Sequence, residues 1–170
     1  MINVTYMLKY ITLLRPKHWI KNLFLFAAPF FGRTLFSGET LRLALPAFLA
    51  FSLCASAVYI YNDITDFDHD KLHPQKKKRP IASGAISKPN ALLFSVILSV
   101  ISLSLAYRIA LSFASFVLSY LFIQLLYSHY LKHIAIADIF CIAAGFMIRV
   151  LAGGAAFSIS VSHWLLLTMF

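Results

Sequence analysis

Three stretches of the chain are long, apolar and free of charged residues. They cover residues 43–62, 89–107 and 109–131. An α-helix needs about 20 apolar residues to cross a hydrocarbon core of about 30 Å. The pattern therefore predicts three transmembrane helices.

Two further stretches are apolar but interrupted. Residues 19–36 carry Lys21 and Arg33 near their ends and Pro29 inside, which predicts a tilted or kinked first span. Residues 139–157 form a fifth span that contains Arg149, and residues 163–170 begin a sixth that is too short to cross. The expected fold is all-α: a polytopic transmembrane bundle with about five complete spans plus the start of a sixth. We expect residues 1–170 to form one membrane domain, the N-terminal part of a larger bundle.

The composition supports a membrane protein. Of the 170 residues 61% are hydrophobic and 12% charged, and the mean hydropathy is +0.81, which excludes an ordinary soluble domain and a disordered chain. Cys54 and Cys141 lie in apolar runs, so we expect them to pack and not to form a metal site or disulfide. The net charge of +9 suits anionic lipid or phosphorylated substrates, and the scattered bases argue against nucleic acid as a partner.

The loop at residues 63–88 sets the expected topology. Six of its residues are basic, whereas Arg33 and Arg42 alone mark the preceding connection. The positive-inside rule places this loop in the cytoplasm, together with the N-terminus and the connection at residues 128–138. We expect a multi-pass protein of the plasma (inner) membrane with its polar chemistry on the cytoplasmic side and no cleavable signal.

Small residues recur at helical spacing on two of the predicted spans. Ser95, Ser99 and Ser102 share one helix face, and Ala50, Cys54 and Ala57 share another. Such stripes predict close helix packing.

Four of the six acidic residues fall between positions 63 and 70. On a continuous helix Asp63, Asp66 and Asp70 share one face with Asn62 beside them, whereas Asp68 points elsewhere. Three converging carboxylates repel one another unless a cation lies between them, and Mg²⁺ takes oxygen ligands while leaving positions for phosphates. The pattern favours a Mg²⁺ site that holds a diphosphate. The alternative is a solvated acidic turn that ends the helix.

Several basic residues have two readings. The bases of residues 76–79, which include Lys76 and Arg79, either anchor to anionic lipid or neutralise substrate phosphate oxygens. Lys17, Lys21 and Asn22 at the end of the first span either bind phosphate or extend toward the head groups. Arg149 within a span either contacts a bound anion or pairs with a backbone carbonyl or Asp138.

The motif Asn62-Asp63-x-x-Asp66-x-x-x-Asp70 resembles the first aspartate-rich motif of the UbiA superfamily of intramembrane prenyltransferases. Three further segments are similar to its decaprenyl-phosphate phosphoribosyltransferase branch: Leu14-Arg15-Pro16-Lys17-x-Trp19-x-Lys21-Asn22-Leu23, His73-Pro74-x-Lys76-x-x-Arg79-Pro80-Ile81-Ala82-x-Gly84 and Gly145-Phe146-x-x-Arg149-x-Leu151-Ala152-Gly153. The likeness covers nearly the whole chain.

The resemblance implies about nine helices around a cavity, with two aspartate-rich loops facing each other. This chain carries only the first loop and ends inside the sixth helix, so we expect a fragment that lacks part of the metal cluster. Many members have a Tyr-x-x-x-Lys element before the fifth helix, and here Tyr127 and Lys132 are one position further apart.

The resemblance implies Mg²⁺-dependent transfer of phosphoribose from phosphoribosyl pyrophosphate to a membrane polyprenyl phosphate, with release of diphosphate. Asp63, Asp66 and Asp70 would hold the metal, Asn62 would orient a phosphate or the metal shell, and Lys76 and Arg79 would bind phosphate oxygens. The alternative is a prenyltransferase that moves a polyprenyl group from its diphosphate to an aromatic acceptor. A transporter-like subunit and an inactive truncated scaffold are further alternatives, although transport pathways usually place charges near the bilayer midplane.

Overall fold

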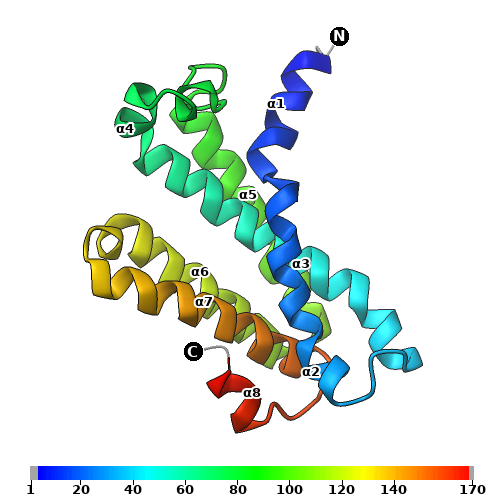
Figure 1. Cartoon of the computed structure of the whole chain (residues 1–170). Helices are drawn as coiled ribbons and strands as arrows, with labels where there is room; N and C mark the ends of the chain where they lie inside the picture. The colour runs from blue at the N-terminus through cyan, green and yellow to red at the C-terminus, as the bar shows by residue number, and fades with distance from the viewer. Residues whose placement is uncertain (1–3, 169–170) are drawn as a thin grey trace.

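The computed structural model describes residues 4–168, and these residues contain helices and no strand (Figure 1). Four helices are long and apolar enough to cross a membrane: α3 (Gly38–Thr65), α5 (Lys88–Ile109), α6 (Leu111–His129) and α7 (Ala135–Ala156). The predicted all-α membrane bundle is confirmed. Short elements join or follow them: α4 (Phe67–Leu72), η2 (Lys76–Lys78), η3 (Leu131–His133) and α8 (His163–Leu167), the last at the expected start of a sixth span.

Serine side chains mark where α3 and α5 begin. Ser37 accepts a hydrogen bond from the Thr40 amide, so α3 starts five residues before the predicted span. Ser87 caps α5 through the Asn90 amide. Between α5 and α6 only Ala110 is extended, at φ −162° and ψ 146°, so these two helices form a tight hairpin.

Helix α3 lies at the centre and packs against α1 (Val4–Leu14), α5, α6 and α7. The predicted small-residue faces meet there: Ser95 Oγ donates to the Ala57 carbonyl oxygen at 2.8 Å, and Ser102 Oγ donates to that of Ala50 at 2.6 Å. Cys54 is fully buried in the same interface, which agrees with a packing role. Small residues therefore let α3 and α5 approach closely, as the sequence indicated.

The N-terminal segment differs from its predicted form. In place of one span over residues 19–36, the chain runs through α1, the 3₁₀ segment η1 (Pro16–Phe26) and the short α2 (Ala27–Phe31). Arg15 separates α1 from η1 with a left-handed backbone, φ 50° and ψ 56°. The chain therefore breaks before Pro16, where helical backbone is disfavoured for the preceding residue. Pro29 causes no break because it lies in the first turn of α2, where its missing N–H costs no helical hydrogen bond.

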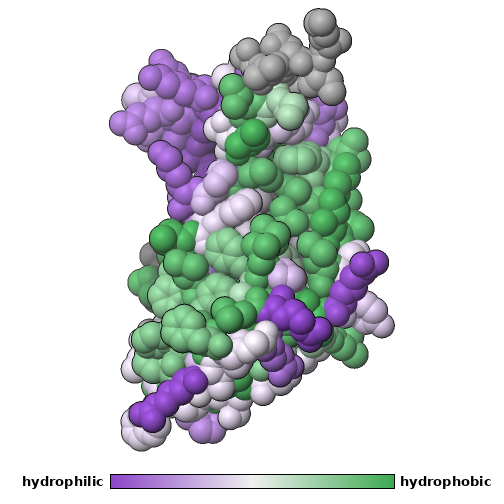
Figure 2. Space-filling model, turned by 90° about the vertical axis from the view of Figure 1, so that its right-hand side faces the viewer, coloured by the Kyte–Doolittle hydropathy of each residue, from purple (hydrophilic) through white to green (hydrophobic). Residues whose placement is uncertain are grey.

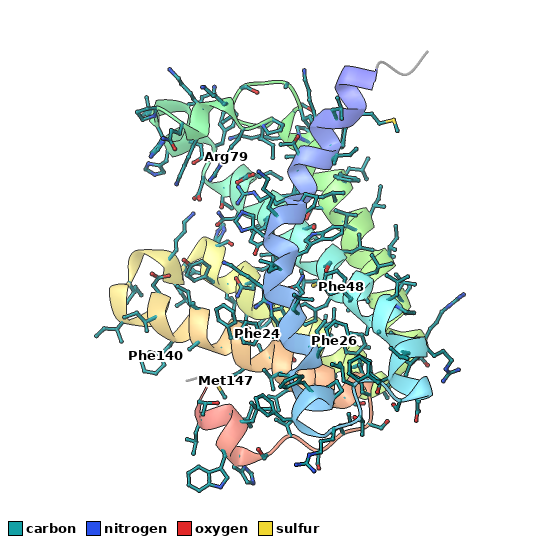
Figure 3. All side chains as sticks on the ribbon, turned by 45° about the vertical axis from the view of Figure 1, so that its right-hand side comes forward. Phe24, Phe26, Phe48, Arg79, Phe140 and Met147 are labelled. Atoms are coloured by element: carbon teal, nitrogen blue, oxygen red, sulfur yellow. The ribbon has the colours of Figure 1, made fainter. Side chains whose placement is uncertain are left out.

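Helix α7 packs against η1 through a glycine. A Cβ atom placed on Gly153 would collide with the backbone of Leu25, so no larger residue fits without moving one of the two segments. Beside this contact Phe26 stacks on Phe48 and Phe157, and Figure 3 shows Phe26 and Phe48 in the middle of the molecule. The outer face is broadly apolar below a hydrophilic end (Figure 2), as expected for helices surrounded by lipid.

Candidate functional site

The aspartate-rich segment lies where α3 ends. Helix α3 stops at Thr65, Asp66 follows with φ −87° and ψ 3°, and α4 begins at Phe67. The run is thus not one continuous helix, and the expected single face for all three aspartates is interrupted at Asp66. Asp68 is exposed, whereas Asp63 and Asp70 are buried.

Asp63 and Asp70 share one arginine. Arg79 Nη1 lies 3.0 Å from Asp63 Oδ1 and 2.6 Å from Asp70 Oδ2. The two aspartates are only 3% and 1% exposed. Lys76 Nζ lies 3.8 Å from Asp70 Oδ1 and adds a second, weaker cation. Arg79 directly follows η2, and Figure 3 shows it at the end of the molecule where α4 lies. The predicted residues Asp63, Asp70, Lys76 and Arg79 therefore form one cluster.

Arg15 completes this cluster, although the sequence did not single it out as a site residue. Its Nη2 donates to Asp63 Oδ1 at 2.5 Å, and its guanidinium lies 5.4 Å from the centre of the Tyr59 ring. A left-handed backbone is uncommon for a residue other than glycine and often marks a functional position. The sequence signal was the Arg15-Pro16 pair, which indicates a helix break but not the direction of the side chain.

Asp66 belongs to the opposite side of the segment. It accepts from Asn62 Nδ2 at 3.0 Å and pairs with Lys132, which also lies 3.5 Å from Thr65 Oγ1. Lys132 comes from η3, in the connection between α6 and α7, so this connection lies at the same end of the bundle as the aspartate-rich loop. The two connections thus lie at one end of the bundle, and the side of the membrane stays a prediction.

Tyr127 donates its hydrogen bond to an acid outside the aspartate-rich segment. Its hydroxyl donates to Asp138 Oδ1 at 2.7 Å, near the start of α7. Tyr127 and Lys132 therefore engage different acids. The sequence named Asp138 only as an alternative partner of Arg149, and in the structure Asp138 accepts from Tyr127 instead.

A second polar centre lies inside the bundle around Arg149. Its guanidinium is buried and donates to Asn22 Oδ1 at 2.9 Å, the Gly145 carbonyl oxygen at 2.6 Å and the Tyr120 hydroxyl at 3.0 Å. The rings of Phe51, Tyr120 and Phe146 surround it at 4.8–5.6 Å. Among the described residues no carboxylate pairs with Arg149. The site thus holds a buried cation that polar and aromatic groups solvate.

Asn22 belongs to this inner centre and not to the aspartate cluster. It is fully buried, and its Nδ2 donates to Ser52 Oγ at 3.0 Å. Ser52 and Asp63 are eleven residues apart on α3, about 16 Å along its axis. Lys17 and Lys21, which were grouped with Asn22, are both exposed, and Lys17 lines a cavity beside Arg15.

The cluster suits a cation between two carboxylates. Arg79 Nη1 occupies the space between Asp63 and Asp70, so a positive charge is accommodated there. In the described part of the chain no three His, Cys, Asp or Glu side chains converge on one metal position, because Asp66 faces Lys132. Asp63 and Asp70 could hold a metal once Arg79 turns to another partner.

The fold and this site define a polytopic membrane protein with a charged site at one end of its helices. Residues 20–170 match the model of the UbiA prenyltransferase family. The chain belongs to this family, and the resemblance drawn from the aspartate-rich motif is confirmed.

Individual relatives show which members of the family this chain is similar to. The decaprenyl-phosphate phosphoribosyltransferase of Mycobacterium tuberculosis is 40% identical over 162 residues, which are 92% of this chain and 53% of the relative. That of Corynebacterium glutamicum is 37% identical over 91% of this chain and 48% of the relative. This chain thus spans about half the length of these relatives.

A solved structure of a UbiA homolog from Archaeoglobus fulgidus, bound to GPP and Mg²⁺, superposes with a TM-score of 0.82. It is 26% identical and covers 95% of this chain, which matches 58% of that protein. The arrangement of helices is therefore that of a known intramembrane fold, and a solved member of the fold binds Mg²⁺.

Proposed function

We propose that this protein takes part in Mg²⁺-dependent transfer of phosphoribose from phosphoribosyl pyrophosphate to a membrane polyprenyl phosphate, with release of diphosphate. The observation that carries the proposal is the buried cluster in which Arg15 and Arg79 meet Asp63 and Asp70. It occurs in a chain that is 37–40% identical to proteins named decaprenyl-phosphate phosphoribosyltransferase.

Mg²⁺ fits this cluster by its donor set. Asp63 and Asp70 supply carboxylate oxygens on either side of a position that now holds a guanidinium nitrogen. Asp66 would join as a third ligand if its contact with Lys132 opened, with Asn62 orienting it. When bound, the metal would neutralise charge on the departing diphosphate.

The cationic residues have a second task. With a metal held by Asp63 and Asp70, the donors of Arg79 and Lys76 would be free for phosphate oxygens. In the reaction an oxygen of the lipid phosphate forms a bond to C1 of the ribose, while the bond from C1 to the diphosphate oxygen breaks. The electron pair departs with the diphosphate, whose negative charge Arg79, Lys76 and Lys132 would stabilise.

A sugar donor accounts for the polar character of the site. A prenyl diphosphate gains much of its affinity from burial of its chain, whereas a phosphoribosyl group must be held by polar contacts. The cluster supplies Arg15, Lys76 and Arg79, and Lys132 lies beside Asp66 at the same end of the bundle. We retain Arg149 and Asn22 as contacts for an anionic group inside the bundle. We retain Lys17 and Lys21 of η1 as contacts for substrate phosphate groups at the bundle surface.

The location follows from charge. We place the protein in the plasma (inner) membrane, with the loop of residues 63–88 and its six basic residues on the cytoplasmic side. A water-soluble sugar diphosphate would then reach the cluster directly, while the lipid acceptor would approach from the bilayer.

The experiment measures both donor binding and transfer. Protein purified in detergent is given Mg²⁺, labelled phosphoribosyl pyrophosphate and a polyprenyl phosphate, and label in the lipid extract and released diphosphate are counted. We expect Mg²⁺-dependent donor binding that weakens with salt, because the contacts are ionic. Transfer from a prenyl diphosphate to an aromatic acceptor, without binding of the sugar diphosphate, would favour the prenyltransferase alternative. Binding of neither donor would refute both and leave the transporter and scaffold readings.

A further inference from the structure

The cavity beside Arg15 and Lys17 lies on the N-terminal side of the aspartate cluster. It has a volume of about 770 Å³ and is bounded by α1 on one side and the segment from Gln75 to Pro80 on the other. Asp63 forms part of its wall, so it adjoins the cluster. The cavity shares Arg15, Asp63 and Arg79 with the cluster, and the reaction scheme above gives the lipid phosphate no position.

The walls of the cavity carry an excess of positive charge. Arg15, Lys17, Lys78 and Arg79 line it, together with the single acid Asp63. Arg15 and Arg79 each contact Asp63 through one nitrogen, which leaves N–H groups of their other nitrogens as donors for a ligand. Within residues 4–168 neither Lys17 nor Lys78 forms an ion pair. The cavity is therefore suited to an anion.

One wall of the cavity is apolar. Leu8, Ile11 and Thr12 share the face of α1 that lines the cavity, and Arg15 lines it just beyond the end of this helix. Leu8 is 55% exposed and Ile11 48% exposed. In Figure 1 helix α1 lies at the N-terminal end, away from α6 and α7, and the exposure of Leu8 and Ile11 shows that this face is uncovered. The face changes from apolar to cationic as it approaches Asp63.

We propose that this cavity binds the phosphate head of a lipid phosphate monoester, with Lys17, Lys78 and Arg15 as its ligands and Leu8 and Ile11 against its hydrocarbon chain. The identification of that lipid as the polyprenyl phosphate acceptor rests on the proposed function. A free sugar diphosphate would gain no binding free energy from the apolar wall. A lipid phosphate can place its phosphate among the cationic residues and its hydrocarbon chain against the apolar wall. The common wall at Asp63 would bring the acceptor phosphate beside the donor.

The test is a binding measurement without donor and without Mg²⁺. The full chain is reconstituted in nanodiscs of zwitterionic lipid, and the Kd for a labelled polyprenyl phosphate and for inorganic phosphate is measured at two salt concentrations. Lys78→Gln and Lys17→Gln should each raise the Kd for polyprenyl phosphate about tenfold, the loss of one charge-assisted contact. Lys77→Gln is the matched control, because Lys77 is exposed next to Lys78 but does not line the cavity. Its Kd should change less than about twofold.

The apolar wall is tested separately. Leu8→Gln should weaken polyprenyl phosphate binding and leave inorganic phosphate binding unchanged, because only the lipid touches that face. Equal effects of Lys77→Gln and Lys78→Gln would overturn the proposal. So would competitive displacement of the lipid by phosphoribosyl pyrophosphate, which would make the cavity a donor site.

Failure of this proposal can be told from failure of the proposed function. If phosphoribose transfer occurs but Lys78→Gln leaves the KM for the lipid unchanged, the cavity assignment is wrong and the function stands. If the lipid binds with the expected dependence on Lys78 but no phosphoribose is transferred, the cavity assignment stands and the function is wrong.

Discussion

Replacing Asp63 by asparagine removes the charge that two arginines share. Asp63 is 3% exposed and accepts from Arg15 at 2.5 Å and from Arg79 at 3.0 Å. A hydrogen bond to a charged group contributes about 1.5–3 kcal/mol. Because the arginine side chains remain 20% and 26% exposed, water offsets part of this loss. We expect the substitution to lower the free energy of unfolding by about 2 kcal/mol.

Thermal unfolding in detergent, followed by tryptophan fluorescence, measures this change. A loss of about 2 kcal/mol corresponds to a fall in Tm of about 4–8 °C for a chain of this size. Asp68→Asn is the control, because Asp68 is exposed and its replacement should change stability by less than about 0.5 kcal/mol. In the transfer assay Asp63→Asn, Asp66→Asn and Asp70→Asn should each lower turnover by orders of magnitude, and Asp68→Asn should have a milder effect.

A double-mutant cycle of Arg15→Gln with Asp63→Asn isolates the contact. We expect a coupling free energy of at least about 1 kcal/mol between these neighbouring positions. Additive effects, or the same fall in Tm for Asp63→Asn and Asp68→Asn, would show that the buried ion pair does not stabilise the protein. Equal losses of turnover in all four aspartate variants would contradict the assignment of separate roles.

Three further outcomes follow from the packing and the charges. Gly153→Val should destabilise the protein by about 1–3 kcal/mol in the same unfolding assay, because its side chain meets the Leu25 backbone, whereas Gly38→Ala, with no atom within 4 Å, should not. Arg149→Lys keeps the charge but cannot reach all three acceptors, so Tm should fall, and an unchanged Tm would argue against the hydrogen bonds. Arg79→Gln should raise the apparent KM for the diphosphate substrate while cysteine accessibility shows an unchanged orientation. An inverted orientation with unchanged kinetics would mean that Arg79 only sets topology.

The long helices and their closest contacts were predictable because they depend on local patterns. Uncharged length predicts a membrane span, and serines three or four residues apart must share a helix face. Ser95 and Ser102 therefore faced α3 as expected, where Ala57 and Ala50 accept their hydrogen bonds. These features need no knowledge of how distant segments meet.

The site was predictable only in part, because its geometry depends on two breaks in helical structure. The end of α3 at Thr65 separates Asp66 from Asp63 and directs it to Lys132, 66 residues away along the chain. The left-handed backbone at Arg15 turns that side chain toward Asp63, 48 residues away. A prediction from helical spacing is valid only along a continuous helix, so it gives neither the contact of Asp66 with Lys132 nor that of Arg15 with Asp63.

The solvation of Arg149 has a consequence for how the protein is made. An arginine at the centre of a span costs roughly 2.5–3.5 kcal/mol when it enters the bilayer alone. Apart from the Gly145 carbonyl of its own helix, the acceptors of Arg149 are Asn22 and Tyr120, which the ribosome synthesises earlier. When α7 leaves the translocon, η1 and α6 already provide these polar groups. The order of the segments along the chain thus lets each be inserted when its partners are present, and α7 expressed ahead of them would enter the bilayer poorly.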